Sequence, residues 1–206
     1  NEVLIETKAI GINYADVCVR FGVYESAKEY VGWPITPGFE VSGTIKAVGK
    51  NVTNWSVGQK VIGFTLFNAY ASEVCVPETQ VLPIPKGFNM EEAAGFPAVF
   101  FTGYHALYQQ AYIPKNSTIM IHSAAGGVGT ALTQLCKAAG HKVIGVIGSS
   151  HKKEYLEKFN PDHIIDKSKE DLWQKAEEYA PGGYQVIFDA NGASTLKDSY
   201  KHLRPT

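Results

Sequence analysis

The 206-residue sequence has no excess of either charge and no long apolar run. It carries 19 basic and 20 acidic side chains, for a formal net charge of −1, and no cluster of Lys or Arg. A nucleic-acid-binding surface is therefore not expected. The longest near-apolar stretch, residues 93–101, contains Gly95 and Pro97, whereas a helix that spans a bilayer needs about 20 apolar residues. Residues 1–10 do not have the pattern of a signal peptide. We therefore expect a soluble, cytoplasmic protein without an integral membrane segment.

Cysteine and histidine are too scattered for a disulfide framework or a metal site. The three cysteines, Cys18, Cys75 and Cys136, form no Cys-x-x-Cys pair. The six histidines show neither His-x-x-x-His nor His-Glu-x-x-His spacing. The sequence therefore predicts reduced thiols and no bound metal.

The first part of the chain has the pattern of an all-β domain. Short runs rich in β-branched residues recur at intervals of about ten residues, and Gly and Pro separate them. These runs cover residues 3–12, 41–49, 59–66, 70–77 and 79–84. They predict a β barrel or sandwich over residues 1–89.

From residue 90 the pattern changes to alternating strands and helices. Asn89 is a good N-cap for a helix over residues 90–94, and a second helical stretch covers residues 101–110. Apolar strands are expected at residues 118–123, 142–147, 163–166 and 185–190, with helices over 128–139, 152–159, 169–179 and 194–202. This alternation predicts an α/β domain over residues 90–206, with a parallel sheet covered on both faces.

A glycine-rich turn lies between the first of these strands and its helix. It reads Ala-Ala-Gly-Gly-Val-Gly over residues 124–129, which is the Gly-x-Gly-x-x-Gly dinucleotide fingerprint with alanine at the first position. Gly126 would let the backbone approach a pyrophosphate, and Gly129 would let the helix pack close to the strand. The helix N-terminus would add free N–H groups. The predicted cofactor-binding residues of the turn are Ala125, Gly126, Gly127, Val128 and Gly129; the alternative is a turn used only for packing.

The end of the second strand favours NADPH over NADH. An acidic residue is expected there when a ribose 2′-OH is bound, but Gly148, Ser149, Lys152 and their neighbours include no carboxylate. Hydroxyl groups and lysines would instead bind a 2′-phosphate. The alternative is that Lys152 and Lys153 are solvated residues of the next helix.

Five stretches together resemble the medium-chain dehydrogenase/reductase superfamily. They are GINYADVCVRFGVY (11–24), PITPGFEVSGTIKAVG (34–49), NWSVGQKVIG (54–63), EEAAGFPAVFFTGYHAL (91–107) and SAAGGVG (123–129). The chain is most similar to the zinc-free quinone oxidoreductase branch, which includes zeta-crystallin and VAT-1-like proteins. This resemblance implies a GroES-like substrate domain over residues 1–89 and a doubly wound Rossmann domain for NADP over residues 90–206.

The resemblance also implies that the activity is independent of zinc. Zinc enzymes of the superfamily carry a cysteine ligand where this chain has Asn13, and a histidine ligand where it has Phe39. Hydride addition to a simple ketone gives a basic alkoxide that benefits from a Lewis acid. Hydride addition to a quinone gives a phenolate-like anion with a conjugate-acid pKa of about 10, which needs little help. The missing ligands therefore favour quinones or activated alkenes as substrates.

Several side-chain roles follow from the resemblance alone. Asn13 would lie near the nicotinamide ribose, Tyr14 would form a wall of the substrate pocket, and Tyr24 occupies the position of the proton-donating tyrosine of enoyl reductases. The alternatives are satisfaction of turn backbone by Asn13, packing by Tyr14, and a surface or barrel-mouth position for Tyr24. Asp16 and Arg20 are expected to form a structural pair.

Three further cofactor contacts are expected in the second domain. Thr102 matches a family segment beside the nicotinamide, and Lys167 could attract a 2′-phosphate. Asn191 follows the fourth strand, at the carboxyl edge where ligands bind in open α/β sheets.

These features predict an NADPH-dependent reductase of small-molecule quinones or related electrophilic carbonyl and enone compounds. One alternative is an enoyl-thioester reductase, free-standing or part of a polyketide-type synthase, and another is a non-catalytic NADP-binding protein. Family members are longer, so both domains are expected to be incomplete in this chain. A homodimer is expected for the full-length protein.

Overall fold

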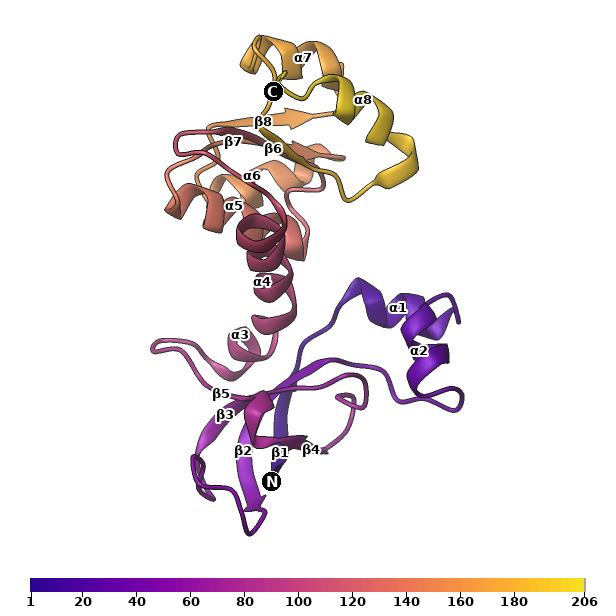
Figure 1. Ribbon diagram of the computed structural model, residues 1–206, viewed down its shortest axis with the longest axis vertical. Helices are drawn as coiled ribbons and strands as arrows, with labels where there is room; N and C mark the ends of the chain where they lie inside the picture. Colours follow the sequence, from indigo (N-terminus) through magenta and orange to yellow (C-terminus); the bar gives the residue numbers. More distant parts are fainter. Residues whose placement is uncertain (206) are drawn as a thin grey trace. The chain divides into compact units, whose positions relative to one another are not determined.

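The computed structural model describes residues 1–205. The chain forms two compact units, Asn1–Ala98 and a second unit that begins at Val99. Each unit has its own sheet and its own core, and each is described by itself (Figure 1).

The N-terminal unit is built on a five-stranded antiparallel sheet in the order β4-β1-β2-β3-β5. Its elements are β1 (Glu2–Ile10), β2 (Glu40–Val48), β3 (Lys60–Phe64), β4 (Glu73–Pro77), the 3₁₀ turn η1 (Glu78–Gln80) and β5 (Val81–Pro83). One face of the sheet forms a buried core that includes Val3, Ile5, Val41, Ile45 and Val76. The β-sheet core predicted for this part of the chain is confirmed.

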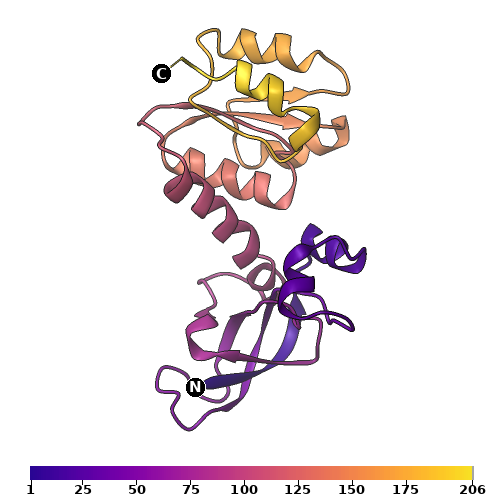
Figure 2. The same cartoon turned by 45° about the vertical axis from the view of Figure 1, so that its right-hand side comes forward.

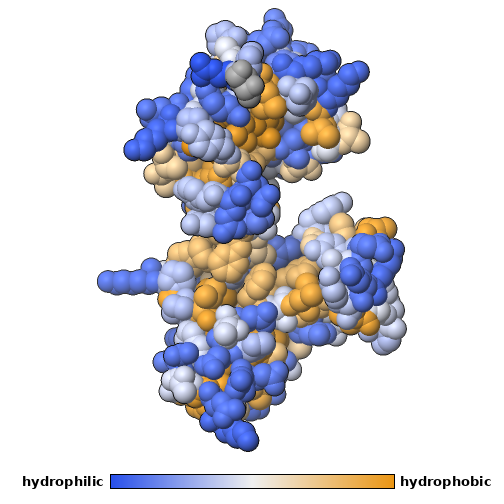
Figure 3. Space-filling view, in the orientation of Figure 1, coloured by the Kyte–Doolittle hydropathy of each residue, from blue (hydrophilic) through white to orange (hydrophobic). Residues whose placement is uncertain are grey.

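Two short helices in this unit were not predicted from the sequence. They are α1 (Tyr14–Arg20) and α2 (Glu25–Tyr30). The N–H of Asn13 donates to the Asp16 carboxylate over 2.8 Å, which satisfies a backbone donor where α1 begins. Both helices expose large side chains such as Phe21 and Tyr30. Figure 3 shows how hydrophilic and hydrophobic residues are distributed over one face of the protein.

Asp16 ties α1 to the rest of the unit. Its carboxylate accepts hydrogen bonds from the N–H of Gly38 and the hydroxyl of Tyr70, each over 3.0 Å. The expected pair with Arg20 is not among the ion pairs of residues 1–205. Helix α3 (Met90–Ala94) begins after Asn89, as predicted, and packs on β1 and β2.

The C-terminal unit is built on a parallel sheet in the order β8-β7-β6-β9. The strands are β6 (Thr118–Ile121), β7 (Lys142–Ile147), β8 (His163–Asp166) and β9 (Val186–Phe188). Alternate residues of each strand point to opposite faces. Ile119 and Ile121 join one buried cluster with Leu132 and Leu156, whereas Met120 joins another with residues of the opposite face. The predicted parallel sheet with two covered faces is confirmed.

Helices cover this sheet as Figures 1 and 2 show, with α5 and α6 on one face and α7 and α8 on the other. The helical elements are α4 (Pro97–Tyr104), the π-helix η2 (His105–Gln110), α5 (Gly127–Ala138), η3 (Ser150–Lys152), α6 (Lys153–Glu157), α7 (Leu172–Tyr179), η4 (Gly192–Ser194) and α8 (Leu196–Lys201). Helix α4 begins four residues earlier than predicted. Pro97 suits a first helical position, and the N–H of Ala98 donates to the Glu40 carboxylate over 2.6 Å. This distant acceptor lies on β2 and was not visible in the local pattern.

Candidate functional site

The glycine turn connects β6 to α5 in the arrangement that the sequence predicted. The N–H of Gly126 donates to the carbonyl of Ser123 over 2.8 Å, which closes the turn. A Cβ atom on Gly129 would lie 2.3 Å from the Ser123 oxygen and 2.7 Å from Cα of Ala124. Only glycine allows α5 to pack this closely against the turn.

The N-terminus of α5 offers unpaired donors to a ligand. No acceptor is present within residues 1–205 for the N–H groups of Gly127, Val128 and Gly129. Such groups, together with the helix dipole, favour an anion. A Cβ on Gly126 would have only the Ser123 oxygen nearby, at 3.2 Å, so its outer side is open. These residues therefore fit the pyrophosphate of a dinucleotide.

A cavity of about 160 Å³ lies beside the turn, at the carboxyl ends of β7 and β8. It is lined by Ser123, Ala125, Gly126, Val146, Ile147, Gly148, Lys152 and Lys167. Five of the predicted cofactor residues therefore come together here: Ala125, Gly126, Gly148, Lys152 and Lys167. Ser149 is adjacent but does not line the cavity, and its hydroxyl donates to the Gly148 carbonyl over 2.8 Å.

Asp166, the carboxylate that directly precedes the lining residue Lys167, is engaged by protein donors. Its oxygens accept from the hydroxyls of Ser150 and Ser168 over 2.5 and 2.6 Å, and from the Ser168 N–H over 3.0 Å. The hydrogen bonds from Ser150 and then Ser168 lower the pKa of Asp166. Lys152 and Lys167 are exposed and take part in no ion pair of residues 1–205.

Asn191 lies on the other side of the turn, after β9. Its side-chain oxygen accepts from the hydroxyl of Ser123 over 3.0 Å. It therefore contacts the glycine turn without lining the cavity.

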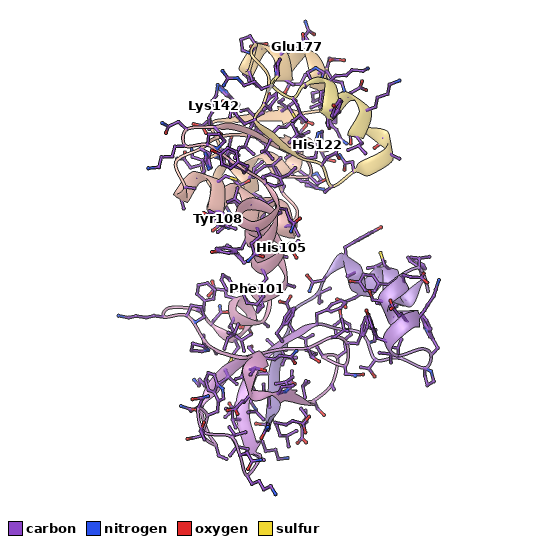
Figure 4. All side chains as sticks on the ribbon, viewed as in Figure 1. Phe101, His105, Tyr108, His122, Lys142 and Glu177 are labelled. Atoms are coloured by element: carbon purple, nitrogen blue, oxygen red, sulfur yellow. The ribbon has the colours of Figure 1, made fainter. Side chains whose placement is uncertain are left out.

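Thr102 lies elsewhere in the C-terminal unit. It lines a second cavity, of about 600 Å³, between α4 and η2 on one side and β9 on the other. The other lining residues are Phe101, His105, Ala106, Gln110, Ala111, Val186, Ile187 and Phe188; Figure 4 labels Phe101 and His105. Thr102 and the glycine turn therefore do not share a cavity.

In the N-terminal unit, Asn13 is held by a buried glutamate. Its side-chain Nδ2 donates to Oε1 of Glu40 over 2.7 Å, while the Ala98 N–H donates to Oε2. Burial raises the pKa of Glu40, and the two hydrogen bonds offset only part of that effect. A Cβ on Gly11 would lie 2.3 Å from Oε1, so the carboxylate is tightly enclosed. Glu40 was not predicted as a site residue, because its partners Asn13 and Ala98 lie far along the chain.

Tyr14 and Tyr24 lie in different surroundings. Tyr14 is 81% exposed at the start of α1. Tyr24 is half-buried before α2, with its ring 6.0 Å from the rings of both Phe39 and Phe67. Phe39 is part of this aromatic cluster.

Within residues 1–205, no group of three or more His, Cys, Asp and Glu side chains is arranged to hold a metal ion. No helix in the same range is long and apolar enough to cross a membrane.

Comparisons with known proteins match both parts of the chain. Residues 1–86 match the alcohol dehydrogenase GroES-like domain, and residues 127–206 match the zinc-binding dehydrogenase family. The synaptic vesicle membrane protein VAT-1 homolog of Danio rerio is 34% identical over 204 residues, which are 99% of this chain and 42% of that protein. The chain spans about half the length of the VAT-1 relatives that it matches.

Two solved structures show the same fold at high similarity. The Escherichia coli quinone oxidoreductase, solved in complex with NADPH, has a TM-score of 0.89 and 30% identity, over 99% of this chain and 62% of that chain. The CurK enoyl reductase has a TM-score of 0.91 and 32% identity, over 100% of this chain and 63% of that chain.

Proposed function

Because the chain belongs to the zinc-free quinone oxidoreductase branch of the medium-chain dehydrogenase/reductase superfamily, which includes VAT-1-like proteins, we propose that it is part of an NADPH-dependent oxidoreductase. The substrates would be quinones or related electrophilic carbonyl and enone compounds. The observation that carries this proposal is the glycine turn, with its unpaired helix N–H groups beside a cavity that two lysines line.

Different residues of this site would bind different parts of the cofactor. The N–H groups at the start of α5 would bind the pyrophosphate, with Gly126 giving close access. Lys152 and Lys167 would attract the 2′-phosphate, because the nearby Asp166 carboxylate is already engaged by Ser150 and Ser168. The distribution of charge around the cavity therefore supports NADPH rather than NADH.

The bound nicotinamide would supply the hydride. The main contribution of the protein would be to hold cofactor and substrate in a reactive geometry. We propose that Asn13 and Thr102 contact the nicotinamide half, that Tyr14 contacts the substrate, and that Asn191 supports the turn. Glu40 fixes the orientation of the Asn13 amide, because its Oε1 accepts the side-chain N–H of Asn13 over 2.7 Å.

The test is quinone-dependent oxidation of NADPH by the full-length protein, followed by the loss of nicotinamide absorbance. Turnover with quinones and little turnover with simple ketones is the expected result. No turnover with quinones, enones or enoyl thioesters would remove the enzymatic proposal. Tight NADPH binding without turnover would instead support a non-catalytic NADP-binding protein.

A second candidate activity is enoyl-thioester reduction, which the similarity to the CurK enoyl reductase favours. Here the hydroxyl of Tyr24 would donate a proton to the carbanion-like product. The Tyr24→Phe variant separates the two activities. A large loss of activity with enoyl thioesters and little loss with quinones would support the enoyl reductase.

The cytoplasmic location and the homodimer of the full-length protein stay predictions.

A further inference from the structure

A polar network lies behind the glycine turn and ends at Ser123. It consists of Asp189, Ser199, His122, Asn191 and Ser123, and is called the Asp189 network below. It connects the loop after β9 and helix α8 to the end of β6. His122 is 1% exposed, and Figure 4 labels it on the side of the sheet that α8 covers. Trp173 of α7 packs beside it, with ring centroids 5.8 Å apart.

Asp189 anchors this network. Its Oδ1 accepts from the N–H of Asn191 over 2.9 Å, the N–H of Gly192 over 3.1 Å and the hydroxyl of Thr195 over 2.8 Å. Its Oδ2 accepts from Ser199 over 2.6 Å. Burial raises the pKa of Asp189, but the hydrogen bonds outweigh burial and lower it overall. The group is therefore a carboxylate that can only accept.

Because the Asp189 carboxylate can only accept, it determines which group donates in each of the other hydrogen bonds of the Asp189 network. Ser199 has one hydroxyl proton and gives it to Asp189, so its 3.2 Å contact with Nε2 of His122 is donated by the imidazole. Burial lowers the pKa of His122, which keeps the ring neutral and leaves Nδ1 as an acceptor.

The same reasoning gives the donors and acceptors between the His122 imidazole and the glycine turn. Nδ1 of His122 faces Nδ2 of Asn191 at 3.5 Å. The amide oxygen of Asn191 consequently faces Ser123 and accepts its hydroxyl proton over 3.0 Å.

Ser123 is the residue whose backbone needs this support. Its φ is +51°, in the left-handed region that side chains other than glycine rarely adopt. Its carbonyl accepts the N–H that closes the turn at Gly126, and the same oxygen lies against Gly129. A change in the Ser123 backbone would therefore move the first N–H groups of α5.

We propose that Asp189 is a positioning residue for a bound dinucleotide, and that it acts through the Asp189 network to fix the backbone of Ser123. The proposal rests on the dinucleotide binding proposed above. The network supports the pyrophosphate, whereas Lys152 and Lys167 lie on the β7–β8 side of the turn. Loss of the network should therefore weaken NADPH binding without weakening the binding of adenosine 2′-phosphate.

The first variant for this test is Asn191→Ala in the full chain, with calorimetric titration of NADPH and of adenosine 2′-phosphate. The dissociation constant for NADPH should rise about tenfold, as expected for one lost hydrogen bond. The constant for adenosine 2′-phosphate should stay unchanged. Ser194→Ala is the matched control, because Ser194 is an exposed residue of the same loop, and it should leave both constants unchanged.

The double variant Asn191→Ala with Ser123→Gly distinguishes positioning from general loss of structure. Glycine adopts positive φ at little cost, so it should recover most of the lost NADPH affinity. A merely structural role of Asn191 would not be rescued in this way.

Asp189→Asn serves as a second variant should Asn191→Ala fail to fold. It retains the Oδ1 acceptor of the loop but places an amide donor against Ser199, which reverses the direction of the network. NADPH affinity should fall and adenosine 2′-phosphate affinity should not. Unchanged NADPH affinity, equal weakening of both ligands, or no recovery in the double variant would overturn the proposal. A wild-type chain that binds neither ligand would overturn the proposed function instead.

Discussion

Two lysines give the candidate site its positive charge. Lys152→Ala and Lys167→Ala should each raise the dissociation constant for NADPH about tenfold, because each removes a cation beside the proposed 2′-phosphate. NADH, which lacks that phosphate, should bind with unchanged affinity. Titration of both coenzymes into each variant checks this. Lys153→Ala is the matched control, because Lys153 is exposed on α6 and does not line the cavity. Equal effects on NADPH and NADH would contradict the assignment.

Glu40 should make stability depend on pH in an unusual direction. Burial raises its folded pKa above the ordinary value of 4.5, so the folded state keeps a proton that the unfolded chain loses. Its contribution to stability is therefore fully present below pH 4.5 and is lost as pH rises through the folded pKa. Relative to Glu40→Gln, the wild type should lose stability as pH rises above 4.5, measured by urea unfolding.

Glu6→Gln provides a control of opposite sign. The hydrogen bond from Lys8 lowers the pKa of Glu6, so the wild type should gain stability over this variant as pH rises from acid. The same slope for both variants would contradict the assignment for Glu40.

Gly129 is the least replaceable glycine of the turn. Gly129→Ala would place a Cβ 2.3 Å from the Ser123 oxygen, and overpacking of this kind costs about 1–3 kcal/mol in the free energy of unfolding. Gly182→Ala is the control, because no atom lies within 4 Å of its ideal Cβ and its φ is not positive. Chemical unfolding of both variants checks this. A loss no larger than that of the control would show that α5 can shift.

At the scale of elements, helix α7 depends on its N-cap. The side chain of Asp171 accepts from the N–H of Gln174 over 2.8 Å. Asp171→Ala should lower the free energy of unfolding by about 1 kcal/mol, whereas Asp171→Ser should retain most of it. Thermal unfolding of the two variants makes the comparison. Equal losses would mean that the cap does not stabilise α7.

The elements that the sequence predicted are those whose signals are local. The strands β6 and β7 are short, continuous apolar runs, and the turn at Gly126 is a short motif. Helix α1 was missed because Gly38 and Tyr70, which hold Asp16, are far along the chain. The roles of Asn13, Tyr14 and Tyr24 came from resemblance, since no local pattern specifies a side-chain function.

The same distinction applies inside the candidate site. Of the residues that line the cavity, Ala125 and Gly126 were predicted from the fingerprint, Gly148 and Lys152 from the residues that follow β7, and Lys167 from the resemblance. His122 and Asp189 were missed, because their partners lie 77 and 10 residues along the chain at Ser199. Their position directly after a parallel strand was the available signal.

At the scale of the whole molecule, the proposed cofactor should stabilise the unit that binds it. A ligand present at 100 times its dissociation constant adds about 2.7 kcal/mol to the free energy of unfolding. Hydrogen exchange of the full chain with and without NADPH should show this gain in β6 and α5. The core strands β1 and β2 belong to a separate cluster and should change less. Protection confined to the N-terminal unit would contradict the site.

The packing of Trp173 has a spectroscopic consequence. Its indole is stacked on His202, 4.5 Å between centroids, and lies beside His122. The emission of this indole therefore depends on its packing against these two neighbours. The other two of the three tryptophans, Trp33 and Trp55, belong to the N-terminal unit. With both replaced by phenylalanine, fluorescence would read the interior behind the glycine turn directly.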